Sequence, residues 1–179
     1  MKKTLFLFAL LCCITATYVE SDELPFFVKL FQVQKVEVPE AQSVIEIAMD
    51  YYGFDAKNNK KELKSLMAVD PTKVPWCAGF TNSVLDKAGF SSPNNLLASS
   101  YHKYGVKVKK TEEPQPGDIV ITKRNGGSNR HVAFYYGSYH DKGIKYIQML
   151  GGNQNNGVNI KPVPASKVVE YRRPVKRYT

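Results

Sequence analysis

The sequence predicts an α+β fold in which helices come first and an antiparallel sheet follows. Apolar residues recur at helical spacing in the first part of the chain, whereas the runs after Gly117 alternate as strands do. Helices followed by strands, without βαβ alternation, are typical of an α+β domain. At 179 residues, one domain is expected. Its N-terminal helices should pack on a sheet of about five strands.

Residues 1–22 have the composition of a secretory signal peptide. Lys2 and Lys3 precede a largely apolar stretch, residues 4–16, that is too short to span a bilayer comfortably. Small residues near its end place the cleavage between residues 16 and 23. We therefore expect a secreted or periplasmic protein whose only link to the membrane is this signal peptide.

The next segments predict an arm and the start of the main domain. Residues 23–38 alternate loosely, which indicates an N-terminal arm or a strand, and residues 39–179 are expected to form the domain. A first helix follows Pro39, which a first helical turn tolerates, and ends at Gly53. A short polar helix is expected over residues 58–68.

The best-marked helix lies between Pro75 and Gly89, the residue types that commonly start and end a helix. Its apolar residues recur every four positions. They are Trp76, Phe80, Val84 and Ala88. One or two further helical turns are expected over residues 96–104.

The sequence of the second half of the domain predicts strands separated by turns. Alternating runs rich in β-branched and aromatic residues are bounded by Gly, Pro, Asn and Asp. They cover residues 118–123, 131–139, 144–150, 157–163 and 167–173. The turn at residues 140–143 joins the second and third runs as a hairpin.

Charge and composition narrow the class of partner. Lys and Arg number 25 against 16 Asp and Glu, a net charge of +9. A basic exported protein suits polyanionic surroundings such as a cell envelope. Nucleic acid is not expected, because the chain has no zinc-finger spacing, RNA-binding signature or basic helical region. We expect a monomer whose lysines mostly form a solvated surface.

Cysteine use singles out Cys77. Cys12 and Cys13 lie in the signal peptide, so the exported chain keeps one thiol and cannot form an internal disulfide. Cys77 follows Pro75 in the first turn of a helix, where unpaired N–H groups and a positive partial charge favour the thiolate. These N–H groups also suit an oxyanion. The alternative is a buried cysteine packed beside Trp76.

His131 is the best of three candidate bases for this thiol. It begins a predicted strand and shares a face with Ala133 and Tyr135, and the small Ala133 leaves room for a helix to approach. His140 lies in a predicted turn, and His102 lies in an ambiguous segment. A surface or hydrogen-bonded histidine is the alternative for each of them.

A catalytic histidine also needs a partner on its second ring nitrogen. In the predicted hairpin, residue 150 lies opposite His131, which brings Asn153 within reach. Gln148 is the reserve candidate. Asp118, at a strand start, is either an acceptor behind the catalytic residues or a turn-forming residue.

No metal site and no cofactor are expected. Without the signal peptide, one cysteine and three scattered histidines remain. They offer no closely spaced pair of ligands of the kind that zinc sites use.

Several segments resemble, in the same order, the cysteine peptidases of the CHAP and NlpC-like type. They are PWCAGFTNSVLDKAGF, LLASSYHKYG, PQPGDIVI, HVAFYYG, MLGGNQ and a closing YRRP. The resemblance spans about residues 40–174 and is strongest to a phage- and bacteria-associated subgroup with the string PWC…GD…HV…GGNQ.

This resemblance implies a papain-like fold and hydrolysis of amide bonds in peptidoglycan or its stem peptides. It places the nucleophile on Cys77, the base on His131 and the third catalytic member on Asn153. Related enzymes often carry an acidic residue near that third position, where this chain has Gly151 and Gly152. We assign the surrounding positions as follows. Substrate or oxyanion binding falls to Trp76, Ala78 and Gln154, and support of the catalytic residues to Asp118 and Gln148.

The sequence therefore predicts an exported cysteine hydrolase, an N-acetylmuramoyl-L-alanine amidase or an endopeptidase, with a Cys-His-Asn type site. Two alternatives stay open. One is a non-catalytic cationic protein that binds the cell envelope on the same scaffold. The other is a secreted acyltransferase or a peptidase that acts on proteins.

Overall fold

Three α-helices and a six-stranded antiparallel sheet make up the part of the chain that the computed structural model describes, residues 40–124 and 129–177. The predicted signal peptide and arm lie outside these ranges. Within them, no helix has both the length and the apolar character needed to cross a membrane.

The elements follow the predicted order, helices before strands. The helices are α2 (Glu40–Met49), α3 (Lys60–Met67) and α4 (Cys77–Lys87), and the short 3-10 helices are η1 (Ala98–Lys103) and η2 (Ala165–Lys167). The strands are β1 (Val106–Lys107), β2 (Ile119–Lys123), β3 (Arg130–Asp141), β4 (Ile144–Gln154), β5 (Gly157–Pro164) and β6 (Val168–Arg173). The α+β class is confirmed and is compatible with a papain-like fold, and the two-residue β1 is the strand that the sequence analysis did not predict.

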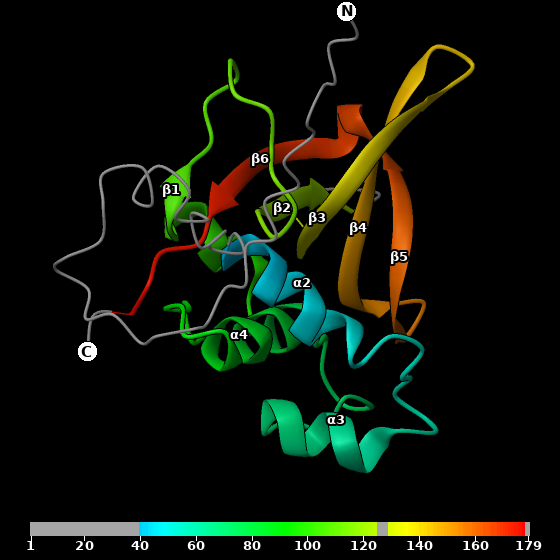
Figure 1. The fold of residues 1–179 in the computed structure, drawn as a ribbon. Helices are drawn as coiled ribbons and strands as arrows, with labels where there is room; N and C mark the ends of the chain where they lie inside the picture. Colours follow the sequence, from blue (N-terminus) through cyan, green and yellow to red (C-terminus); the bar gives the residue numbers. More distant parts are fainter. Residues whose placement is uncertain (1–39, 125–128, 178–179) are drawn as a thin grey trace, which may run out of the picture. The chain divides into compact units, whose positions relative to one another are not determined.

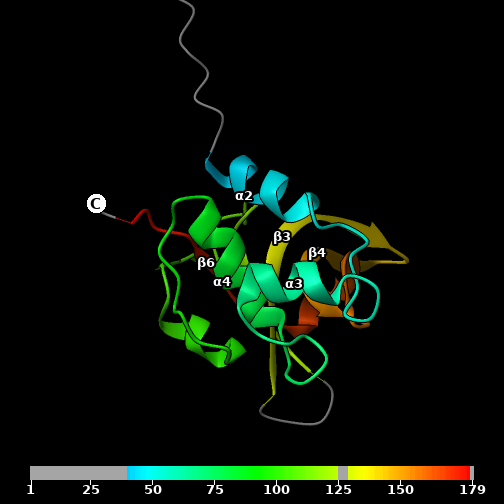
Figure 2. The same cartoon turned by 90° about the horizontal axis from the view of Figure 1, so that it is seen from below.

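The helices cover one face of the sheet. The strand order is β1-β6-β2-β3-β4-β5, with all neighbours antiparallel. Helix α4 contacts β3 and β4, and α2 and α3 pack against α4 (Figures 1 and 2). The main core lies between these layers and includes Phe80 and Leu85 of α4 with Val132 and Phe134 of β3. The opposite face carries a smaller cluster. It is formed by Val120, Ala133, Tyr135, Ile147 and Met149.

Two tight turns shape the β3–β4 and β4–β5 hairpins of this sheet. Lys142 and Gly143 have φ values of 47° and 78°, and Asn155 and Asn156 have values of 54° and 61°. Positive φ at both central residues matches the twist of a two-residue hairpin. Because the second turn begins only at Asn155, β4 continues to Gln154 instead of ending at the predicted residue 150.

Asp118 ties the start of β2 to the neighbouring strand β6. Its carboxylate is 1% exposed and accepts the Gln115 N–H at 2.9 Å. It also accepts two hydrogen bonds from the Arg173 guanidinium, each at 3.0 Å. One of these bonds closes the turn before β2, two join β2 to β6, and none of them reaches His131.

Replacing Asp118 with Asn should lower the free energy of unfolding by about 2 kcal/mol, because it removes one partner of a largely buried ion pair. The half-exposed Arg173 keeps the effect below that of a fully buried pair. Urea denaturation measures it. Asp86→Asn is the matched control, since the Asp86–Arg177 pair is exposed on both sides and its loss should cost less than about 1 kcal/mol. Equal losses in the two variants would contradict this account.

Candidate active site

Cys77 is the first residue of α4 and is 3% exposed. Trp76 is the N-cap residue and makes no side-chain capping bond. The first helical hydrogen bond runs from Phe80 N–H to Trp76 O at 2.9 Å. The helix itself therefore supplies no acceptor for the N–H groups of Cys77, Ala78 and Gly79. The predicted placement of the thiol at a helix start is confirmed, and so is its burial beside Trp76.

Gly152 on β4 fixes the position of this helix start. A Cβ atom at Gly152 would lie 2.5 Å from Cζ3 of Trp76 and 2.7 Å from Cβ of Phe80. Only a glycine lets the aromatic side chains pack this closely on the strand. Close packing therefore explains the glycine at position 152. Related enzymes often carry an acidic residue near this part of the chain.

Gly152→Ala should reduce the free energy of unfolding by about 1–3 kcal/mol, because the new methyl group overlaps the Trp76 ring. Gly137→Ala is the matched control on β3. Its Cβ would meet only the flexible end of Gln148, at 3.1 Å, so it should be nearly neutral. Thermal or urea unfolding compares the two variants. If Gly152→Ala proves as stable as the control, α4 does not begin against β4 as described.

His131 is the second residue of β3 and is held by Gln154 at the end of β4. Its Nε2 lies 3.3 Å from Oε1 of Gln154. The Gln154 amide nitrogen donates to the main-chain oxygens of Met149, Gly151 and Asn159, at 3.0, 3.3 and 2.6 Å. These bonds orient the amide so that its oxygen faces the ring.

This orientation sets the protonation of the imidazole. Because Oε1 of Gln154 is an acceptor, Nε2 of His131 carries the proton and donates it, and Nδ1 keeps a lone pair. Nδ1 is buried and has no hydrogen-bond partner among the described residues. The ring therefore presents an unused proton acceptor, which is the chemical requirement for a general base.

The surroundings of His131 keep the ring neutral. Burial, the charge of Arg124 and the weaker effect of Lys161 together lower the pKa of His131 to about 4, and the Gln154 hydrogen bond acts in the opposite direction. At neutral pH the imidazole is therefore ready to accept a proton, although such a low pKa makes it a weak base.

The same pKa predicts a stability that depends on pH. In the unfolded chain His131 takes up a proton near pH 6.5, whereas the folded ring does so only near pH 4. The free energy of unfolding should therefore fall by about 3 kcal/mol as the pH drops from about 6.5 to 4. Urea denaturation at several pH values tests this. His131→Gln should remove this slope and the exposed His140→Gln should keep it, and identical slopes would refute the assignment to His131.

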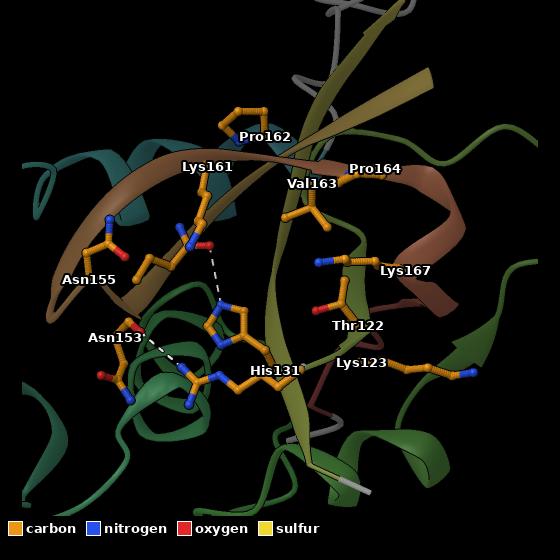
Figure 3. A pocket seen from close by; sticks show the side chains of 12 residues that line it. Thr122, Lys123, His131, Asn153, Asn155, Lys161, Pro162, Val163, Pro164 and Lys167 are labelled. Carbon is orange, nitrogen blue, oxygen red and sulfur yellow. Dashed lines mark hydrogen bonds between the residues drawn. The ribbon is translucent and has the colours of Figure 1, made fainter. Parts of the chain in front are cut away.

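A basic pocket of about 260 Å³ opens beside His131, on the rim formed by β2, β5 and η2. Figure 3 shows Lys161 and Lys167 around it, together with Asn153. The lining residues are Thr122, Lys123, Arg124, His131, Asn153, Gln154, Asn155, Lys161, Pro162, Val163, Pro164 and Lys167.

The structure brings His131, Asn153 and Gln154 together, but the bond expected of Asn153 is made by Gln154. Asn153 has a φ of 57°, and its main-chain oxygen accepts a hydrogen bond from Arg124 at 3.3 Å. The observed pairs of β3 with β4, such as Phe134 with Leu150, bring the start of β3 to the end of β4. The predicted register, which set residue 150 opposite His131, is wrong.

Cys77 starts the helix that packs at the same end of β4, since its neighbour Trp76 lies against Gly152. On β3, Val132 and Phe134 belong to the main core, whereas Ala133 belongs to the smaller cluster on the opposite face. The expectation that a helix would approach over Ala133 is wrong, because α4 packs on the Val132 face. Among the described residues no hydrogen bond joins the Cys77 thiol to His131, and Cys77 does not line the pocket.

The remaining predicted site residues lie elsewhere. Trp76 and Ala78 are buried with Cys77 in the main core. Asp118 binds Arg173, and Gln148 pairs with Gly137 in the middle of the hairpin. Within residues 40–124 and 129–177, no three His, Cys, Asp or Glu side chains come together as metal ligands.

Sequence reasoning missed two features of the site. It gave Gln154 a role in substrate binding, because it ended β4 four residues too early. It also treated the lysines as a dispersed surface, whereas Lys161 and Lys167 gather with Arg124 around one pocket. The adjacent asparagines Asn155 and Asn156, a strong turn signal, would have placed the hairpin correctly.

Comparison with known families gives one match. Residues 69–153 match the CHAP domain, and this range includes both Cys77 and His131. The domain is typical of peptidoglycan hydrolases, amidases or endopeptidases, and its members are generally cysteine- and histidine-dependent amidohydrolases. No curated protein matches the chain.

Proposed function

We propose that the protein is an exported cysteine hydrolase that cleaves amide bonds in peptidoglycan, as an N-acetylmuramoyl-L-alanine amidase or an endopeptidase. The observation that carries the proposal is the CHAP match over residues 69–153, which includes a thiol at a helix start and a histidine with an oriented, unused lone pair. These are the two reactive groups that a cysteine-dependent amidohydrolase requires.

In the proposed reaction, Nδ1 of His131 takes the proton of the Cys77 thiol, and the thiolate attacks the carbonyl carbon of the scissile amide. N–H groups at the start of α4 stabilise the oxyanion that forms. The imidazolium gives its proton to the leaving amine as the C–N bond breaks. Water, deprotonated by His131, then attacks the thioester and releases the acid and the free thiol.

The first step requires the thiol and the imidazole to come together. Trp76, next to Cys77, packs on Gly152, and Gln154, two residues further along β4, holds His131. Both groups therefore belong to one end of β4. Catalytic hydrogen bonds often form with good geometry only in the complex with substrate, and we assign the approach of His131 to that stage.

Gln154 takes the role of the third catalytic member in this proposal, in place of Asn153. Its amide fixes the tautomer in which Nε2 of His131 is protonated and Nδ1 can act as a base. Trp76 and Ala78 form the wall beside the sulfur. Residues 1–22 act as the signal peptide, residues 23–38 as an arm, and the exported hydrolase domain works as a monomer.

The products of peptidoglycan digestion test the function. Purified protein is incubated with peptidoglycan, and the soluble products are identified by mass spectrometry. An amidase would release whole stem peptides with a free N-terminal amine and leave the lactyl groups on the sugar chains. An endopeptidase would give shortened stem peptides or opened cross-bridges. Failure to release any new amine, across a range of pH and peptidoglycan types, would contradict the proposal.

The basic pocket favours a second candidate, a non-catalytic protein that binds anionic polymers of the envelope. Its surface beside His131 carries several cations and no acidic side chain. In a protein that only binds, the thiol of Cys77 has no need of activation and should react with iodoacetamide as an ordinary buried thiol does. Rapid alkylation below pH 7 would count against this second candidate.

A further inference from the structure

We propose that the basic pocket beside His131 binds a carboxylate group of the peptide substrate, next to the amide that is cleaved. The proposal rests on the proposed function for its choice of peptide. Its structural basis is independent of that function, because it depends on the charges and polar groups that line the pocket.

The cations of the pocket come from separate segments of the chain. Arg124 follows β2, Lys161 lies on β5, and Lys167 ends η2 and points toward the middle of the pocket in Figure 3. No acidic residue is among the lining residues of this pocket. Like charges gathered in this way repel one another, and a bound anion would relieve that repulsion.

Polar groups around the cations suit a small planar anion. Arg124 is held in place by its bond to Asn153 O at 3.3 Å, and a guanidinium has more N–H donors than this bond uses. Guanidinium groups bind carboxylates through paired hydrogen bonds. The buried His131, 7% exposed with an unpartnered Nδ1, forms part of the same wall.

The position of the pocket connects binding to the reaction. Arg124 and Lys161 both disfavour the protonated form of His131. A carboxylate that neutralises them should restore the basicity of the ring and stabilise the imidazolium formed during catalysis. A peptide carries carboxylates at its C-terminus and on acidic side chains. Binding of a substrate with such a carboxylate would therefore make His131 a stronger general base.

The test follows the His131 ring by NMR in the full chain with Cys77→Ala, which cannot form the thioester. The pH titration is recorded for the protein without ligand and then with each of three ligands. These are a stem peptide that has free carboxylates, the same peptide fully amidated, and inorganic phosphate. The free-carboxylate peptide should raise the His131 pKa by about one unit. The amidated peptide should leave it unchanged, and phosphate should act more weakly at equal concentration.

Charge-removing variants locate the binding. Arg124→Gln and Lys161→Gln should each weaken binding of the free-carboxylate peptide roughly ten-fold. Lys57→Gln is the matched control, because Lys57 is exposed and lies outside this pocket. Equal shifts with the amidated peptide, a larger shift with phosphate, or no effect of the two variants would each overturn the carboxylate assignment. If the unaltered protein hydrolyses no peptidoglycan, the proposed function is refuted. The carboxylate assignment is tested separately, because binding is measured in the inactive Cys77→Ala variant.

Discussion

Cys77→Ala is expected to reduce peptidoglycan hydrolysis by roughly 10⁴-fold or more, because the covalent route through a thioester is lost. Cys77 is the free cysteine of the described residues and the thiol within the matched CHAP range. No neighbouring side chain can replace it as a nucleophile of similar strength. The initial rate of amine release from peptidoglycan, compared with that of the unaltered protein, measures the effect.

The burial of Cys77 makes a stability control necessary. Its side chain is 3% exposed and packs in the main core, so removing the sulfur should also lower the free energy of unfolding, by about 1 kcal/mol. Urea denaturation separates this loss from the catalytic one. Cys77→Ser keeps the shape of the side chain but offers a much weaker nucleophile, so it should be inactive as well. A Cys77→Ala protein that still releases amines at the normal rate would remove Cys77 from the mechanism.

The elements with local sequence signals were predicted well. Helix α4 has Pro75 before it, Gly89 after it and a regular apolar repeat, and the structure has the helix over Cys77–Lys87. The strand beginning near His131 alternates clearly and is observed as β3. These signals act within about ten residues, where backbone preference and periodicity decide the conformation.

The features that the sequence did not reveal depend on contacts between elements. Alternation showed that Val132 and Ala133 lie on opposite faces, but not which face the helix would choose. In the structure, the size of the side chains decides which face the helix covers. The larger Val132 and Phe134 fill the space beneath α4, and Gly152 lets Trp76 pack closely on β4. Such complementarity between distant segments has no periodic signal in the sequence.

The third member of the site was missed for a related reason. A prediction of register requires the length of the hairpin and any irregularity within it. The β3–β4 pairing shifts between Tyr135 and Gly137, and the β4–β5 pairing shifts between Gly151 and Gln154. The positive φ of Asn153 accompanies the second shift. A single residue of shift changes which side chain faces His131, so Gln154 occupies the place expected of its neighbour.

Gln154→Ala is expected to lower kcat by about 100-fold, because His131 loses the acceptor that fixes its tautomer. The hydrogen bond from Gln154 raises the pKa of His131 against the effects of burial and Arg124. Its loss should therefore move the acid limb of the pH–rate profile to lower pH. Gln154→Glu should not rescue the activity, because a carboxylate cannot donate to the main-chain oxygens of Met149 and Asn159 that the amide nitrogen binds.

Asn153→Gly provides the comparison that separates the two candidates for the third position. Glycine tolerates the φ of 57° at this residue, so the substitution removes the side chain without backbone strain. Because no described hydrogen bond joins the Asn153 side chain to His131, activity should change by less than about three-fold. The Gln154 amide also satisfies buried carbonyl oxygens, and unfolding experiments must show that Gln154→Ala remains folded at the assay temperature. The opposite result would be a large loss of kcat and a shifted acid limb in Asn153→Gly, with a normal kcat and acid limb in Gln154→Ala. In that case Asn153 orients the base in the active state, and catalysis does not use the bond between Gln154 and His131.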